Sequence, residues 1–313
     1  MKDNKYLVEG SLIGTPENRE YISSLSGLEK ARQEGKILEG VVKMCDSESL
    51  DLYIDLKGIT GIIPKGECVL EDEVKDIAII TRVGKAVAFK VMQIIKGENG
   101  EVSAVLSRRE AQRDCQNNYL MDLIPGDIIP AKVTHLEQFG VFLDVGCGIC
   151  ALMSVDSISV SRISSPRDRF LPREEINVIV KSIDYEKKRL FVSTKELLGT
   201  WEENARDYKV GQTVSGIVRS IESYGIFVEL TPNLAGLAEL KDGVKVGERC
   251  AVYIKSIIPE KMKIKLVIID TYENTDMPGT RDYYFVDTEK TKHIDRWQYS
   301  PDKSQRLIET VFE

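Results

Sequence analysis

The sequence predicts a mainly β fold in which three five-stranded barrels follow one another along the chain. Two observations carry this prediction: an internal repeat, and short runs rich in β-branched residues that are separated by turn residues. Three segments open alike at Gly35, Gly126 and Gly211, which lie 91 and 85 residues apart. Each repeat contains about five such runs, and strands this short cannot each bury a face alone.

Closing five short strands into a small barrel removes most of the exposed strand edge, and the OB-fold is the common five-stranded solution. The second and third repeats agree in detail, because residues 139–142 are Phe-Gly-Val-Phe and residues 224–227 are Tyr-Gly-Ile-Phe. A glycine between an aromatic residue and a strand is typical of a barrel corner or bulge, where a Cβ does not fit. We therefore expect Gly140 and Gly225 to lie at such corners.

Short helical connectors, an N-terminal helix and a small C-terminal β extension are expected around the barrels. Residues 16–33 have helical periodicity, and helix formers with charged faces follow the first and second repeats. Aromatic runs at 283–286 and 296–299 predict a few strands packed on the third barrel. The predicted organisation is an N-terminal helical extension (1–34), repeat one (35–110), a helical linker (111–124), repeat two (125–197), a second helical linker (198–208), repeat three (209–272) and a C-terminal extension (273–313).

Composition favours a globular protein of the cytoplasm. The 313 residues are 42% hydrophobic and 30% charged, and the formal net charge of −7 excludes a strongly basic nucleic-acid binder as a description of the whole chain. Residues 125–200 and 208–272 carry net charges of 0 and +2, so the acidity lies mainly outside repeats two and three. No apolar run approaches the roughly 18 residues of a membrane helix, and the first residues do not resemble a signal peptide. We expect no membrane association.

Groups suited to catalysis or metal binding are sparse. Of the six cysteines, only Cys147 and Cys150 have the spacing of a metal or redox motif, and the two histidines, His135 and His293, add no second ligand pair. We interpret the two cysteines as reduced thiols in a turn and a strand. The sequence also lacks a phosphate-binding glycine-rich loop and a nucleophile elbow. We therefore expect no enzyme activity, cofactor, metal or small-molecule substrate.

The repeated motif resembles the RNA-binding repeat of bacterial ribosomal protein S1. Three such repeats cover about residues 35–271, a layout similar to that of the short S1-like proteins of Gram-positive bacteria. Repeat one is the weaker match, because residues 46–56 contain no Phe-Gly-x-Phe element. It resembles instead the first repeat of the long S1 proteins, which implies docking to the ribosome rather than a grip on RNA.

In repeat two, the resemblance implies a site for single-stranded RNA. Phe139 and Phe142 match the two stacking aromatics of the family, Arg189 matches its basic residue, and Asp184 matches its acidic residue one position out of register. Ser154 stands where the family has a histidine, and its hydroxyl can hydrogen-bond but cannot stack. Exposed rings hold unstacked bases at about 1–3 kcal/mol each. Alternatively, one ring of the pair fills the barrel core, since strand side chains alternate between faces.

Repeat three matches the same pattern less well. Tyr224, Phe227 and Lys263 match the stacking and basic positions, whereas Glu239 occupies the histidine position and Pro259 the acidic one. A carboxylate that faces phosphates lowers affinity. We expect repeat two to contribute more of the binding.

A loop between the third and fourth strands of repeat two is rich in arginine. Arg162, Arg167, Arg169 and Arg173 lie around Phe170 in the sequence. Such a cluster can clamp an RNA backbone at the mouth of the barrel, or it can be a solvated loop balanced by nearby acidic residues. Under the first interpretation, replacing Arg167 and Arg169 together lowers RNA affinity.

Together these features predict a non-catalytic protein that binds single-stranded RNA through tandem barrels. The resemblance implies that the RNA is messenger RNA and that the partner is the small ribosomal subunit. The alternative is an adaptor that binds proteins on the ribosome or in an RNA-processing complex and binds RNA only weakly. The missing family histidines and the degenerate first repeat favour this alternative.

Overall fold

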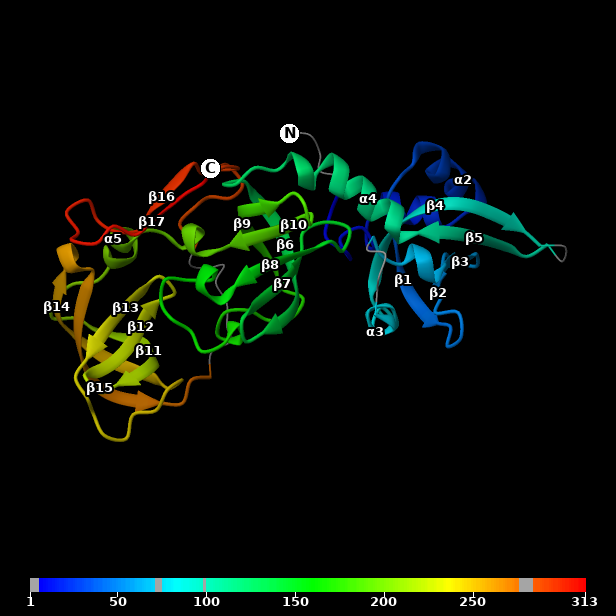
Figure 1. Cartoon of the computed structure of the whole chain (residues 1–313). Coiled ribbons are helices and arrows are strands. Elements are labelled where there is room, and N and C mark those ends of the chain that lie inside the picture. The colour runs from blue at the N-terminus through cyan, green and yellow to red at the C-terminus, as the bar shows by residue number, and fades with distance from the viewer. Residues whose placement is uncertain (1–5, 71–74, 98–99, 276–283) are drawn as a thin grey trace. The chain divides into compact units, whose positions relative to one another are not determined.

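Closed five-stranded barrels make up most of the computed structural model, which describes residues 6–70, 75–97, 100–275 and 284–313 (Figure 1). Three barrels follow one another, with few helices between them, so the predicted fold class is confirmed. The N-terminal helices and a C-terminal two-stranded sheet are also present.

The elements are named in chain order, with η for a short 3-10 helix. The first barrel and its flanking elements are α1 (Pro16–Ile22), α2 (Leu25–Glu34), β1 (Leu38–Cys45), β2 (Leu52–Asp55), β3 (Thr60–Ile63), η1 (Lys65–Glu67), α3 (Asp76–Ile80), β4 (Ala86–Lys96), β5 (Val102–Ser107), α4 (Arg108–Asn118) and η2 (Leu120–Asp122). The second barrel contains β6 (Ile128–Glu137), β7 (Gly140–Asp144), β8 (Cys150–Ser154), η3 (Val155–Ser157), η4 (Pro166–Asp168), β9 (Glu175–Asp184) and β10 (Arg189–Ser193). The remaining elements are η5 (Lys195–Leu198), α5 (Trp201–Ala205), β11 (Thr213–Glu222), β12 (Gly225–Thr231), β13 (Leu234–Ala238), β14 (Arg249–Ile258), η6 (Pro259–Lys261), β15 (Lys263–Tyr272), β16 (Arg296–Gln298) and β17 (Glu309–Val311).

The three barrels share one strand order. It is β1-β2-β3-β5-β4 in the first, β6-β7-β8-β10-β9 in the second and β11-β12-β13-β15-β14 in the third, each closed on itself. In every barrel the third and fifth strands pair in parallel. Closure leaves no long unpaired edge, and one face of each strand fills a small apolar core while the other faces outward.

The chain divides into two compact units. The first consists of residues 1–123 and 144–150 and contains the first barrel. The second consists of residues 124–143 and 151–313 and contains the second and third barrels with the C-terminal extension.

In the first unit, the N-terminal helices close one side of the first barrel. Thr15 caps α1 and Ser24 caps α2 by accepting backbone N–H groups, and α2 ends at Gly35 with a φ of +61°. Leu28 and Ala31 on α2 are fully buried in the same core cluster as the strands of the first barrel. The helical period of the sequence therefore identifies the face that packs.

The segment before α1 is held by buried charges of the first unit. Arg108 Nε donates to Glu9 Oε1 at 2.6 Å, and the Glu9 backbone N–H donates to Asp144 Oδ2 at 2.7 Å. Burial raises the pKa of Asp144 to about 6. Glu39 accepts the N–H groups of residues 10, 12 and 13, yet burial raises its pKa to about 7.

In the second unit, buried polar side chains join the second barrel to the third. Asn233 Oδ1 accepts the Val160 N–H at 2.9 Å, and its amide donates to the carbonyls of Lys195 and Gly199 at 2.8 and 2.9 Å. Asn233 is fully buried, so these bonds satisfy groups that cannot reach water. The contact between the two barrels is therefore specified by directional bonds as well as by apolar packing.

The C-terminal extension packs on both barrels of the second unit. Trp297 and Tyr299 belong to the core cluster of the third barrel, as the aromatic run at 296–299 predicted. Ile294 and Phe312 pack instead against a cluster of the second barrel. The run predicted at 283–286 lies partly outside the described residues, since position 283 is not described.

Candidate nucleic-acid interface

An aromatic pair stands on the outer surface of the second barrel. Phe139 lies in the turn before β7 with 57% of its side chain exposed, and Phe142 lies half-buried on the outward face of β7. Their ring centroids are 5.9 Å apart with an interplanar angle of 88°. Neither ring belongs to the buried core, so the structure meets the condition that base stacking requires.

Glycine makes this arrangement possible. A Cβ on Gly140 would lie 2.3 Å from the carbonyl oxygen of Met153 on the facing strand, so only glycine allows the turn to approach β8. The Val155 N–H donates to the Phe139 carbonyl at 3.0 Å and fixes the same turn. The predicted close approach at Gly140 is confirmed, as is that at Gly225, where φ is +154° and a Cβ would lie 2.6 Å from a carbonyl oxygen.

The third barrel repeats the geometry of the aromatic pair. The rings of Tyr224 and Phe227 have centroids 6.1 Å apart and an interplanar angle of 89°. Tyr224 is 67% exposed and Phe227 is half-buried on the outward face of β12. We call the two pairs, Phe139–Phe142 and Tyr224–Phe227, the aromatic platforms.

Each platform continues across the strands as a row of outward side chains. In the third barrel the strand register places Leu237 beside Phe227 and Lys265 beside Leu237, followed by Ser256. In the second barrel Phe191 lies beside Leu152, and Ser182 lies beside Phe191. The separation from the platform phenylalanine to this leucine is ten residues in both barrels.

Lys265, Phe191 and the two leucines were not selected from the sequence. Period-two counting from Arg189 and from Lys263 would have found Phe191 and Lys265, because outward residues alternate along β10 and β15. His135 was also missed as part of the platform: its ring lies 6.5 Å from that of Phe142, and its Nε2 lies 2.7 Å from Glu137 Oε1.

Three other residues predicted in repeat two lie on strands of the same barrel: Ser154 on β8, Asp184 on β9 and Arg189 on β10. Arg189 is exposed and pairs in register with Asp184, whose Oδ1 accepts the Lys187 N–H at 3.0 Å. Asp184 therefore also stabilises the β9–β10 turn. Ser154 lies half-buried at the end of β8, and its hydroxyl is 3.0 Å from that of Ser157.

In the third barrel, basic side chains offset the carboxylate of Glu239. Lys255 Nζ lies 3.3 Å from Glu239 Oε1, and both side chains are exposed. Lys263 is exposed at the start of β15, and Pro259 begins η6. Exposed ion pairs are weak, so Lys255 reduces the local negative charge without removing it.

The arginine loop differs from the expectation at one position. Arg167 is exposed, but Arg169 is 2% exposed and its Nη2 donates to Glu229 Oε2 of the third barrel at 2.5 Å. Phe170 is buried as well. Because its guanidinium is enclosed between two barrels, Arg169 cannot contact RNA, and the prediction that it clamps a backbone is wrong.

The first barrel has half of a platform. Tyr53 pairs with Ile62 and with Met44, as Phe227 pairs with Leu237 and with Ser220, and it is half-buried on the outward face. The position before it that corresponds to Phe139 is Leu50, which is buried. The weak motif of repeat one thus corresponds to a single outward ring.

The cysteine pair of the sequence does not form a joint site. Cys147 is buried, its pKa raised by its contact with Cys115 and by burial, whereas Cys150 is exposed. No cluster of three possible metal ligands exists among the described residues. Within the same residues, no helix is long and apolar enough to cross a membrane.

Residues 122–195, which contain the second barrel, match the S1 RNA binding domain. Over most of its length the chain is similar to the small ribosomal subunit protein bS1 homolog of Bacillus subtilis (strain 168), with 27% identity over 277 residues, 87% of this chain and 69% of the relative. It is 26% identical over 301 residues to bS1 of Staphylococcus aureus (strain COL), covering 90% of this chain and 74% of that protein. The predicted resemblance to the S1-like proteins of Gram-positive bacteria is therefore confirmed.

Among solved structures, the chain is similar to a multidomain protein with nucleic acid binding domains from Streptococcus pneumoniae TIGR4. The identity is 14% and the TM-score 0.24, over 77% of this chain and 76% of that one.

Proposed function

We propose that this protein binds single-stranded RNA, without catalysis, on the aromatic platforms of its second and third barrels. The observation that carries this proposal is the repetition of one geometry in two barrels: two nearly perpendicular rings about 6 Å apart, one exposed and one half-buried. An apolar core does not require two such pairs on the outside of a barrel, whereas unstacked bases do.

The charges around the platforms suit moderate binding. Arg189 is exposed at the start of β10 in the second barrel, and Lys263 and Lys265 lie on the outward face of β15 in the third. Each phosphate contact contributes about −0.7 to the salt slope for single strands, so a few contacts give a modest slope. The rings therefore supply much of the affinity, and the cations supply the rest.

The similarity to bS1 proteins supports a more specific role. We propose that the RNA is messenger RNA, that the protein acts in the cytoplasm, and that it associates with the small ribosomal subunit. Two barrels in series raise the effective concentration of one strand at the second platform once the first is occupied.

The experiment compares RNA binding by the intact protein and by a variant with Phe139→Ala and Phe142→Ala, using labelled oligoribonucleotides and fluorescence anisotropy. The loss of about 1–3 kcal/mol per stacked base predicts an affinity at least fivefold lower in the variant. Tyr253→Ala is the matched control, because Tyr253 is an exposed ring (40%) outside the platforms.

An equal affinity of the platform variant and the intact protein would instead support the adaptor function. That alternative rests on Ser154 and Glu239, which stand where a family histidine is expected. An equal loss in Tyr253→Ala would contradict the assignment of binding to the platforms.

A further inference from the structure

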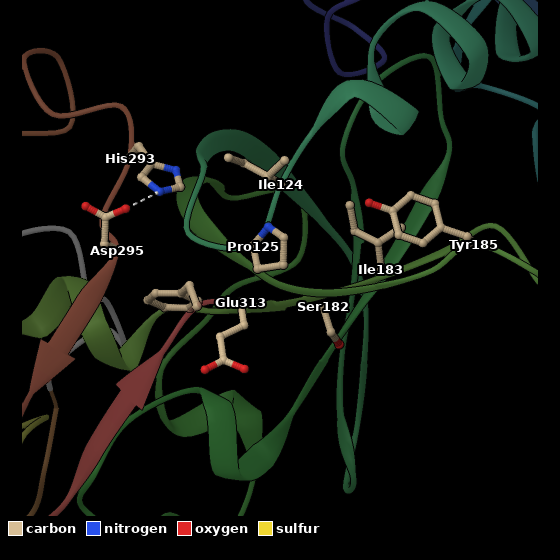
Figure 2. A pocket seen from close by; sticks show the side chains of 9 residues that line it. Ile124, Pro125, Ser182, Ile183, Tyr185, His293, Asp295 and Glu313 are labelled. Atoms are coloured by element: carbon tan, nitrogen blue, oxygen red, sulfur yellow. Dashed lines mark hydrogen bonds and ion pairs between the residues drawn. The ribbon is translucent and has the colours of Figure 1, made fainter.

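A cavity of about 500 Å³ lies between the second barrel and the C-terminal extension, within one compact unit. We call it the tail pocket. Its apolar wall includes Pro125, Ile183, Tyr185 and Phe312, and its polar side includes His293 and Asp295. Figure 2 shows His293 and Asp295 on one side of Pro125, and Ile183 and Tyr185 on the other.

The tail pocket continues the outward row of the second barrel. Ser182 lines the pocket, and it lies beside Phe191 in the register of β9 and β10. Phe191 in turn lies beside Leu152 on β8, the strand next to the one that carries Phe142. Neighbouring strands are about 4.8 Å apart, so the path around the closed barrel from β7 to β9 by way of β8 and β10 is roughly 14 Å long. One OB barrel contacts about 4–16 nucleotides, so a bound strand spans this distance.

The charge of the pocket excludes a phosphate as its occupant. His293 is held between two carboxylates, with Nδ1 2.8 Å from Asp127 Oδ1 and Nε2 3.2 Å from Asp295 Oδ1. These bonds raise the pKa of His293, the bond to Asp127 most, and they use both ring nitrogens. Glu313 adds a further carboxylate to the lining. A group that enters must therefore not be anionic, and it must offer hydrogen-bond donors to the carboxylates; a neutral base of a bound strand meets both conditions.

We propose that the tail pocket binds one base of the same RNA strand and that guanine fits it best. This inference rests on the proposed function of the aromatic platforms. The Tyr185 ring is 58% exposed and offers a stacking surface. Asp295 Oδ1 lies 3.2 Å from His293 Nε2, and the Asp295 side chain is 98% exposed, so its carboxylate is accessible to an incoming base. Guanine alone among the RNA bases carries two adjacent donors, N1–H and N2–H, on its Watson–Crick edge, and a carboxylate accepts both.

The test uses a labelled twelve-residue oligouridine and a series in which one uridine is replaced by guanosine at successive positions. In the intact protein, guanosine at one position is expected to raise affinity about fivefold or more. Asp295→Asn is expected to bring this guanosine-to-uridine ratio close to one, and inosine, which lacks the N2 amino group, is expected to lower it partly. Asp302→Asn is the matched control, because Asp302 is an exposed carboxylate of the same extension outside the pocket.

The ratio separates this inference from the proposed function. Phe139→Ala with Phe142→Ala lowers affinity for both oligonucleotides and leaves the ratio unchanged if both proposals hold. If Asp295→Asn leaves the guanosine-to-uridine affinity ratio unchanged, or if guanosine raises affinity at no position, the proposal that the tail pocket binds guanine is refuted. The proposed function of the aromatic platforms is not affected by either result. Normal binding by the phenylalanine variant overturns the proposed function. Photocrosslinking of the guanosine position to Tyr185 supports the pocket independently.

Discussion

The ion pair between the second and third barrels leads to an asymmetric stability prediction. Glu229 is shared: Arg169 Nη2 donates to Oε2 at 2.5 Å, while Arg219 donates through Nε to Oε2 at 2.9 Å and through Nη2 to Oε1 at 3.0 Å. Arg169 and Glu229 are 2% and 5% exposed. Arg219 has a second acidic neighbour, Asp168, at 3.5 Å.

Removing the carboxylate of Glu229 leaves the guanidinium groups of Arg169 and Arg219 with Asp168, which is partly exposed, as the remaining acidic neighbour. We expect Glu229→Gln to lower the free energy of unfolding of the second unit by about 3–5 kcal/mol, the usual cost of breaking a buried pair from one side. Arg169→Met leaves Glu229 in both bonds with Arg219 and keeps an apolar stem of similar length. Its expected cost is about 1.5–3 kcal/mol, the value of a hydrogen bond to a charged group.

Urea unfolding followed by tryptophan fluorescence measures this difference. The two tryptophans of the chain, Trp201 and Trp297, both lie in the core cluster of the third barrel, so the signal reports the unit that contains the ion pair. Glu239→Gln is the matched control, because it is the same substitution in an exposed pair, which contributes about 0–1 kcal/mol. A cost for Glu229→Gln no larger than that of the control, or one equal to that of Arg169→Met, refutes the shared-carboxylate argument.

Three further predictions concern other parts of the molecule. Burial raises the pKa of Glu39 from 4.5 to about 7, so the folded state binds this proton more tightly than the unfolded state does. The free energy of unfolding of the first unit should therefore fall by about 3 kcal/mol as the pH rises from 4.5 to 7. Hydrogen exchange of the β1 amides measures this fall, and Glu39→Gln should abolish it. Gly140→Ala should lower the free energy of unfolding by about 1–3 kcal/mol through overpacking, and it should weaken RNA binding. Gly66→Ala is the control, because a Cβ there meets open space, and it should change neither quantity. Urea unfolding measures the stability, and fluorescence anisotropy measures the binding. Arg189→Ala should reduce the slope of log affinity against log salt by about 0.7 and Arg206→Ala should leave it unchanged, with equal slopes contradicting a phosphate contact at Arg189.

The features predicted correctly from sequence are those with local causes. A glycine between two aromatic residues marks a corner where backbone approaches backbone, and this constraint acts within a few residues of Gly140 and of Gly225. The barrels follow from runs of alternating residues, whose outward members are fixed by the period of a strand. The outward position of Phe142 and of Phe227 is a consequence of the same alternation.

The features that sequence reasoning missed depend on partners far along the chain. The residues around Arg169 have the composition of a surface loop, so the sequence suggests an exposed side chain. Arg169 is instead buried in an ion pair with Glu229, which lies sixty residues later in another barrel. The strand that contains Glu39 gives no reason by itself for a raised pKa. Residues 10–13, which lie earlier in the chain, donate backbone N–H groups to the Glu39 carboxylate, and burial of this carboxylate raises its pKa. The tail pocket likewise combines Tyr185 with residues more than a hundred positions away.

The charges of the second unit divide recognition between two kinds of contact. Under the proposed function, rings dominate at the platforms, and Ser154 and Glu239 stand where the resemblance places a histidine. Any base could then stack there, and we expect a weak sequence preference. In the proposed tail pocket, carboxylates would repel the phosphates of the same strand and favour a base that offers donor groups. Repulsion of the wrong group is an efficient source of specificity, because it penalises every competing placement at once. If both proposals hold, the carboxylates of the C-terminal extension select where along a strand the protein rests and do not abolish its RNA binding.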